Sequence, residues 1–200
     1  MLKFVNLKEL DVSDVATPTL DTNVNIVNDD ALLEFFTHIK MEFPLLEVVK
    51  MVNWKLKLKN TNMTMKVMKQ QLKALQKLKT VSLNNIDFVS CKVDEMNKDP
   101  LFLKYLIKYL PNLQMLSILR AKLDFDQVPS LVKALKFRVR KNSIQLHTKH
   151  MMANEELLFR LERIKWISSK YDSLRGTIDI SNNHQESILR KLRNKIHWQY

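Results

Sequence analysis

Few residues of this chain have the types and spacing that chemistry requires. His147 and His150 are the only close pair among five histidines, and their HxxH spacing can place two imidazoles near one metal ion. Without nearby acidic or cysteine partners, we interpret both as surface histidines. Cys91 is the only cysteine, which excludes a cysteine-based zinc site and an internal disulfide.

The glycine content argues against nucleotide-dependent catalysis. Gly176 is the only glycine, whereas loops that bind phosphate need several glycines so that backbone N–H groups can approach the anion. The sequence also contains neither GxSxG nor HExxH. We therefore expect a non-catalytic protein with no cofactor, no metal and no small-molecule substrate.

The charged residues are distributed unevenly. The net charge is +12, yet residues 1–47 contain nine acidic and three basic residues, and segments 48–86 and 127–154 contain no acidic residue. Clustered lysine and arginine residues attract polyanions. The candidate residues for nucleic-acid binding are Lys66, Lys69, Lys73, Lys77, Arg138, Arg140 and Lys141.

Two observations favour a different main function. Lysine-rich helix faces are often only solvated, and lysine, which outnumbers arginine here, cannot bind phosphate in the bidentate manner of arginine. The sequence also shows no aromatic residues interleaved for stacking on single-stranded bases. Nucleic-acid association, as in a ribonucleoprotein or chromatin protein, is therefore the alternative function.

A repeated apolar pattern predicts the elements that position these residues. Copies begin at residues 4, 43, 75 and 110, so the intervals are 39, 32 and 35 residues. Two weaker copies keep a central pair, Ile144 with Leu146 and Ile178 with Ile180. The fullest copy has the order LxxLxxLxIxxAxL and consists of Leu110, Leu113, Leu116, Ile118, Ala121 and Leu123.

This pattern resembles a leucine-rich repeat of the divergent, helix-rich intracellular type, such as the F-box-associated and ribonuclease-inhibitor-like repeats. The consensus Asn after the strand is missing from the first five copies. The resemblance implies an α/β fold, a right-handed solenoid shaped as a short horseshoe, with about six repeats. Its parallel strands would form the concave face and its helices the convex face. One domain would span 1–200, with clear repeats in 1–125 and degenerate repeats in 126–200.

The resemblance also implies a protein-protein interaction module, as in the substrate-recognition domain of an F-box-type ubiquitin ligase. An F-box is not in this chain because the first copy begins at Phe4. We therefore expect either a fragment of a longer protein or a first repeat that another protein covers.

The intervals between the copies predict amphipathic helices. Their expected starts are Asn28 or Asp29, the residue after Thr64, Asp99 with Pro100, a position near Asp126, Asn154, and the residues after Asn182 or Asn183. Six strands alternating with six helices predict one continuous parallel sheet.

Alternate residues of the expected strands point away from the helices. Four of them are apolar, on what we expect to be neighbouring strands, and exposed apolar patches mark docking sites for proteins. The alternative is that another part of the chain covers them. The candidate protein-binding residues are Val48, Lys50, Val52, Met115, Ser117 and Leu119, with Lys50 setting the orientation of the partner.

The sequence indicates an intracellular protein, in the cytoplasm or nucleus. No window approaches 18 uninterrupted apolar residues, and the start of the chain lacks the pattern of a secretory signal. Extracellular leucine-rich repeats usually have disulfide-bonded caps, which one cysteine cannot form.

Overall fold

The computed structural model describes residues 6–12, 26–27, 29–56, 62–85, 87–88, 101–120, 128–149 and 154–183. These residues form an α/β structure with five helices and two sheets. In chain order the elements are β1 (Glu9–Asp11), β2 (Ile26–Val27), α1 (Asp29–Glu42), β3 (Val48–Val52), β4 (Lys55–Leu56), α2 (Asn62–Ala74), β5 (Thr80–Asn84), β6 (Asp87–Phe88), α3 (Leu101–Tyr109), β7 (Met115–Ser117), α4 (Val128–Val139), β8 (Ile144–His147), α5 (Asn154–Glu162), β9 (Ile167–Asp172) and β10 (Thr177–Asn182).

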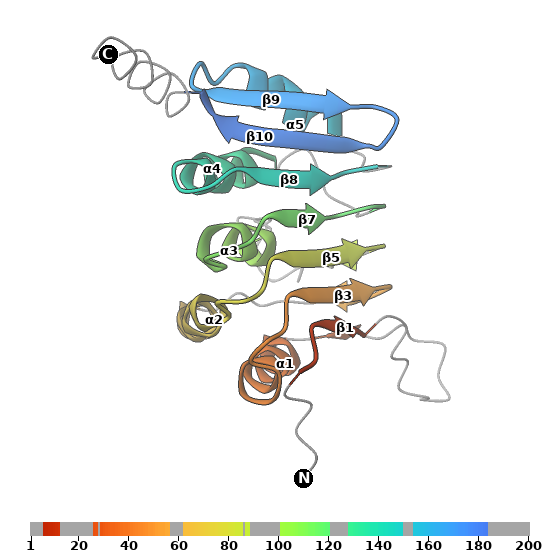
Figure 1. Cartoon of the computed structure of the whole chain (residues 1–200), viewed down its shortest axis with the longest axis vertical. Coiled ribbons are helices and arrows are strands. Elements are labelled where there is room, and N and C mark those ends of the chain that lie inside the picture. The colour runs from red at the N-terminus through yellow and green to blue at the C-terminus, as the bar shows by residue number, and fades with distance from the viewer. Residues whose placement is uncertain are drawn as a thin grey trace, which may run out of the picture.

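The larger sheet has seven strands in the order β1-β3-β5-β7-β8-β10-β9. The first five are parallel and follow the order of the chain, so each helix from α1 to α4 connects one strand to its neighbour (Figure 1). All six predicted strands contribute to this sheet, although Val12 and Ile118 lie just after the ends of β1 and β7. The predicted parallel direction is wrong for the sixth, because β10 runs antiparallel to β8.

A hairpin that the repeat pattern did not predict reverses the chain. Strands β9 and β10 are antiparallel, and the side chain of Asp172 accepts hydrogen bonds from the backbone N–H groups of Leu174 (3.1 Å) and Arg175 (3.2 Å). Gly176 completes the turn with a φ of 64°. Such a self-bonded Asp and a left-handed glycine are typical turn chemistry. Arg175 therefore belongs to a hairpin turn and not to the entry of another repeat.

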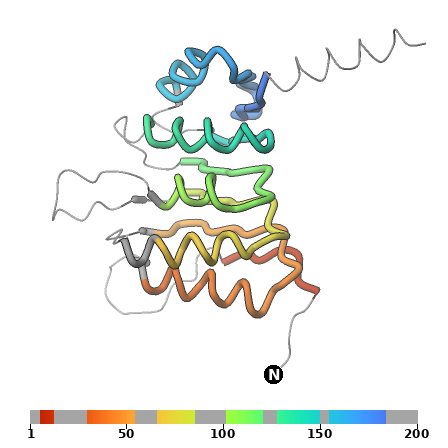
Figure 2. Tube along the Cα trace, turned by 90° about the vertical axis from the view of Figure 1, so that its left-hand side faces the viewer, coloured from red at the N-terminus to blue at the C-terminus, as the bar shows by residue number. Residues whose placement is uncertain are grey.

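The helices form a single layer on one side of the larger sheet. Each of the five contacts the next along the chain, and Figure 2 shows α1 to α4 stacked in the same order as the strands. The predicted apolar stripes face the sheet, as Leu32, Phe36 and Ile39 of α1 illustrate with at most 1% exposure. Most of the sixth predicted helix lies outside the described residues.

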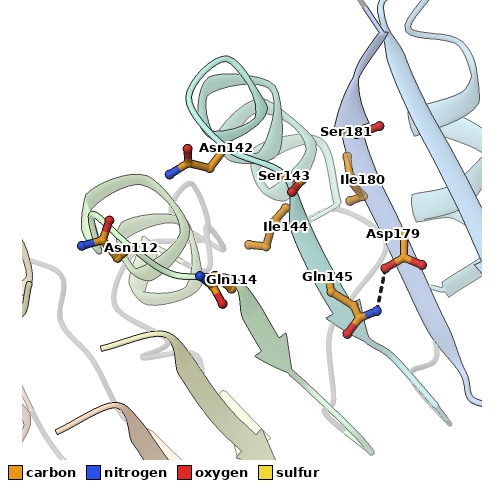
Figure 3. A pocket seen from close by; sticks show the side chains of 9 residues that line it. All are labelled: Asn112, Gln114, Asn142, Ser143, Ile144, Gln145, Asp179, Ile180 and Ser181. Atoms are coloured by element: carbon orange, nitrogen blue, oxygen red, sulfur yellow. Dashed lines mark hydrogen bonds between the residues drawn. The ribbon is translucent and has the colours of Figure 1, made fainter. Parts of the chain in front are cut away.

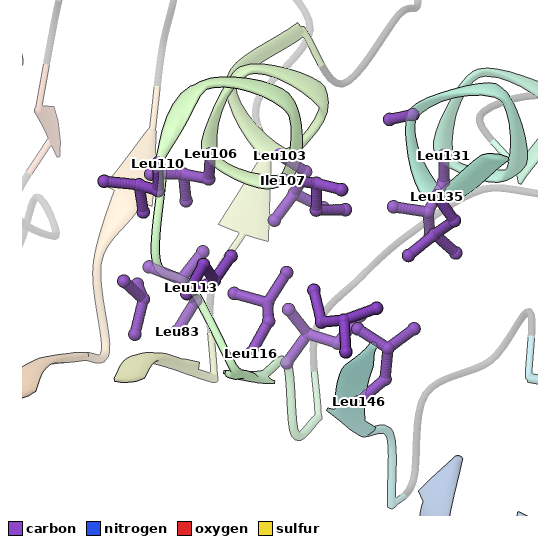
Figure 4. Close-up of a cluster of buried hydrophobic side chains, with 14 of the residues drawn as sticks. Leu83, Leu103, Leu106, Ile107, Leu110, Leu113, Leu116, Leu131, Leu135 and Leu146 are labelled. Atoms are coloured by element: carbon purple, nitrogen blue, oxygen red, sulfur yellow. The ribbon is translucent and has the colours of Figure 1, made fainter. Parts of the chain in front are cut away.

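The core lies between this helix layer and the sheet. In Figure 4, Leu106 and Ile107 of α3 point toward Leu83 and Leu116 of the strands, and all four side chains are fully buried. The same positions of the repeated pattern are buried in the neighbouring units, at Val49 and Val81 for example. For the predicted strands and helices that the structure describes, the periodicity thus correctly predicts which face is buried.

A second, three-stranded parallel sheet, in the order β2-β4-β6, follows the turns that leave the larger sheet. Asn53, Asn85 and Arg120 occupy equivalent places after β3, β5 and β7, and each has a positive φ between 54° and 62°. Asn tolerates this left-handed conformation better than most residues. The Asn85 side chain also donates to the Asn53 side chain (2.5 Å), which links two successive turns.

Candidate binding surfaces

The outward face of the larger sheet is the first candidate surface. Side chains alternate across it, so that positions facing the helices are buried while most of those on the other side are partly or fully exposed. Strand register aligns the outward residues in two rows. One row contains Glu9, Val48, Thr80, Met115, Gln145, Asp179 and Lys170, and the other contains Asp11, Lys50, Ser82, Ser117, His147, Thr177 and Asp172.

The centre of this face is almost uncharged. From β3 to β8, Lys50 is the only ionic side chain of the two rows, and it forms an ion pair with Glu9 of β1. The hydrogen bond between the two side chains and the negative charge of Glu9 raise the pKa of Lys50. Lys50 is therefore held toward β1, and the central strands present neutral side chains.

The four apolar candidates do not form the single patch that the sequence suggested. Strand β5 lies between β3, which carries Val48 and Val52, and β7, which begins at Met115 and is followed two residues after its end by Leu119. The outward side chains of β5 are Thr80, Ser82 and Asn84. The expectation of neighbouring strands is therefore wrong, because a strip of small polar side chains separates two apolar strips.

Ser117 is less accessible than its outward position suggests. Its side chain is 5% exposed, and its hydroxyl donates to the side chain of Asn84 (2.9 Å). Ser117 therefore links β7 to β5, whereas Val48, Val52, Met115 and Leu119 are all partly exposed.

A polar hollow of about 590 Å³ opens at the edge where the parallel strands begin. Figure 3 shows its lining from the segments before β7 and β8 and from β10. Gln145 donates to Asp179 across it (2.6 Å), which ties β8 to the antiparallel strand β10. The lining residues are Asn112, Gln114, Asn142, Ser143, Ile144, Gln145, Asp179, Ile180 and Ser181.

The lining of this hollow combines carboxamides and hydroxyls with the carboxylate of Asp179 and two isoleucines. Asn112, Gln114, Asn142 and Gln145 each supply a carbonyl acceptor and an amino donor, the same pair of groups that a peptide backbone presents. Gln145 belongs both to the hollow and to the first outward row. The hollow and the sheet face are therefore continuous. The repeat pattern did not reveal the hollow, because it forms only where β10 reverses direction.

The same edge carries an ion pair beside the hollow. Glu47 and Lys79 directly precede β3 and β5, and their side chains are 2.8 Å apart. The hydrogen bond from Lys79, together with its charge, lowers the pKa of Glu47. Because the Gln114 N–H donates to the Lys79 carbonyl (2.8 Å), this pair is adjacent to the hollow.

The outer side of the helix layer is the second candidate surface. Lys66, Lys69 and Lys73 lie on α2, and Lys77 follows it. Arg140 and Lys141 follow α4 and are exposed. These six candidates for nucleic-acid binding thus extend from α2 to α4 across the layer.

Arg138 does not belong to that surface. It is 1% exposed, and its guanidinium donates to the carbonyl oxygens of Leu110 (2.6 Å) and Pro111 (3.0 Å) and to that of Leu113. Burial lowers its pKa. The choice of Arg138 as a nucleic-acid contact is therefore wrong, because its charge is used to bind the carbonyls at the end of α3.

The remaining candidates for chemistry are simple to place. His147 lies in the second outward row of the sheet, whereas His150 and Cys91 lie outside the described residues. The described part of the chain holds no group of three or more His, Cys, Asp or Glu side chains that could bind a metal ion. Within the same ranges, no helix has the length and apolar character needed to span a membrane.

Comparisons of the chain with protein-family models, with curated proteins and with solved structures found no match.

Proposed function

We propose that this chain is a non-catalytic leucine-rich-repeat module that binds an extended segment of a partner protein on the outward face of its larger sheet. The observation that carries the proposal is the pair of in-register rows, whose central strands present neutral and partly apolar side chains on a protein of net charge +12. Exposed neutral surface of this kind is typical of protein interfaces, which are depleted of charge at their centre.

The recurring unit supports the repeat assignment. Three consecutive units place a strand of the larger sheet before a left-handed residue, at Asn53, Asn85 and Arg120. In the first two of these units a strand of the smaller sheet and then a helix follow. A unit that buries its apolar face only against its neighbours is the physical basis of a solenoid.

The two parts of the surface suit different groups of a polypeptide. The strips formed by Val48 with Val52 and by Met115 with Leu119 would contact apolar side chains. The carboxamides of the hollow would bind peptide N–H and C=O groups of the same segment. A polyanion is a poor ligand for this face, since Glu9 and Asp179 border the neutral centre.

The resemblance to F-box-associated repeats suggests a specific kind of protein binding, namely substrate recognition in an F-box-type ubiquitin ligase. A single cysteine supports an intracellular location, in the cytoplasm or nucleus.

Affinity capture from nuclease-treated native extract tests the proposal. The parent chain should retain a protein that a Met115→Ser, Leu119→Ser variant loses, since removing apolar anchors from an interface typically costs about 2 kcal/mol or more each. The purified partner should then bind the variant at least tenfold more weakly in calorimetry.

A matched control removes apolar surface elsewhere. Phe159 and Leu174 are 55% and 90% exposed and lie outside the two apolar strips, so Phe159→Ser with Leu174→Ser should leave capture unchanged. If the partner is captured equally by both double variants, or lost from both, the sheet face is not the binding site.

A further inference from the structure

The charges of the helix layer separate by helix. Helices α2, α3 and α4 contain no acidic residue, whereas α1 contains four and α5 contains three. The middle of the layer is therefore basic and is bordered on both sides by helices with an excess of acidic residues. A polyanion attracted to this layer would be directed to its three central helices.

Aromatic rings lie between the lysines of these central helices. The Nζ atoms of Lys69, Lys73 and Lys108 lie 5.2, 6.0 and 5.4 Å from the ring centre of Tyr109. Lys108 and Lys141 lie 4.9 and 5.2 Å from the ring centre of Phe137. We call these residues the basic-aromatic band: Lys69, Lys73, Lys108, Tyr109, Phe137 and Lys141.

Helix packing assembles this band from distant parts of the sequence. Lys69 and Lys73 come from α2, Lys108 and Tyr109 from α3, and Phe137 from α4, and α3 contacts both of the others. Both rings are partly exposed. The alternation of basic and aromatic residues that the linear sequence does not show is therefore present on the folded surface.

The helix dipole explains only part of the arrangement. Basic residues favour the last turn of a helix, and the five helices all have one there. This preference does not require three ammonium groups to meet at one ring. None of the ion pairs between described residues involves a lysine of the band, so no carboxylate of the described residues pairs with these ammonium groups.

We infer that the basic-aromatic band binds single-stranded nucleic acid. The flexible stem of a lysine lets its ammonium move from a ring to a phosphate. The ring face that becomes free can then stack on an unpaired base, which is the usual combination in proteins that bind single strands. An anionic membrane fits less well, because the large apolar residues exposed in the described structure do not come from α2, α3 or α4.

The test uses the full chain and a fluorescently labelled single-stranded RNA of twelve nucleotides, with anisotropy measured at several salt concentrations. Changing Lys69, Lys73 and Lys108 to Gln should weaken binding at least tenfold at low salt. The slope of log affinity against log salt should fall by about 2, because each phosphate contact to a single strand contributes about 0.7.

The control changes Lys149, Lys165 and Lys170 to Gln, which removes the same charge from exposed positions outside the band. Its affinity should stay within about threefold of the parent. If both triple variants lose affinity equally, net charge alone drives binding and the band is not a site.

Stacking is tested separately by Tyr109→Leu and Phe137→Leu, which remove a ring but keep an apolar side chain. Each should weaken single-strand binding about tenfold with an unchanged salt slope, and leave binding to a duplex of the same sequence unaffected. Thermal melting identifies a variant that is unfolded. Equal binding of duplex and single strand, or binding to phosphatidylserine vesicles without binding to RNA, would overturn the inference.

Discussion

Gly176 combines two properties that the turn between β9 and β10 requires. Its φ of 64° is left-handed, and a Cβ added to it would lie 2.7 Å from the Cβ of Lys149. Its carbonyl accepts the Thr148 N–H (2.8 Å), so the backbone of the turn packs directly on the end of β8. The only glycine of the chain thus stands where the parallel sheet changes to an antiparallel one.

Replacing Gly176 by Ala should therefore lower the free energy of unfolding by about 2 kcal/mol or more, since the left-handed conformation alone costs about 1–2 kcal/mol. Chemical denaturation measures the change, and Ser173→Ala in the same exposed turn is the control. Gly176→Asn separates the two causes. If Asn, which tolerates a positive φ, restores full stability, close contact with Lys149 is not a constraint.

At the scale of elements, β7 is the middle strand of the seven in the larger sheet. Leu116 is fully buried and pairs in register with Val81 of β5 and Leu146 of β8. Because β7 is hydrogen-bonded to both strands, each of the three helps to hold its neighbour in place. A defect at Leu116 should therefore extend to both neighbouring strands.

Leu116→Asp should lower the free energy of unfolding by several kcal/mol, on the order of 4, because a buried carboxylate without a partner is very costly. Amide hydrogen exchange should become faster in β5 and β8 as well as in β7. Gln114→Asp, at an exposed position two residues earlier, serves as the control. An unchanged melting temperature for the Leu116 variant would show that β7 is not central to the fold.

Periodicity predicts the elements whose burial is regular and misses the one whose burial is not. Strand β5 alternates strictly between partly exposed and buried residues, whereas β9 has a single buried residue, Ile167. An edge strand with one buried side chain leaves no period-2 signal. Its hairpin was nonetheless encoded by Asp172 and Gly176, whose spacing is typical of a turn.

The candidate surfaces were predictable only where they follow the strand repeat. The outward positions of β3 and β7 were correctly assigned to one face, but their separation by β5 depends on the order of strands. The contact of Gln145 with Asp179 spans 34 residues, and that of Lys69 with Tyr109 joins two helices. Pairings at such distances follow from packing and cannot be read from local sequence.

At the scale of the whole molecule, the sheet and helix layers present opposite kinds of surface. The sheet face is neutral at its centre, and the outer side of α2, α3 and α4 is basic without acidic residues. Because the core separates the two surfaces, one ligand need not exclude the other. We therefore expect the chain to hold a protein partner and a nucleic acid at the same time.

Ionic strength should distinguish the two surfaces. Met115→Ala with Leu119→Ala should weaken the protein partner at every salt concentration, since loss of apolar contact does not depend on screening. Changing Lys66, Lys69, Lys73 and Lys77 to Ser should weaken RNA binding, and mainly at low salt, where the attraction of surface charge is strongest. Titrations with purified partner and RNA, separately and together, measure both effects. If the apolar variant binds its partner as tightly as the parent does while the lysine variant does not, the partner is recognised by the helix layer and the sheet face has no part in binding.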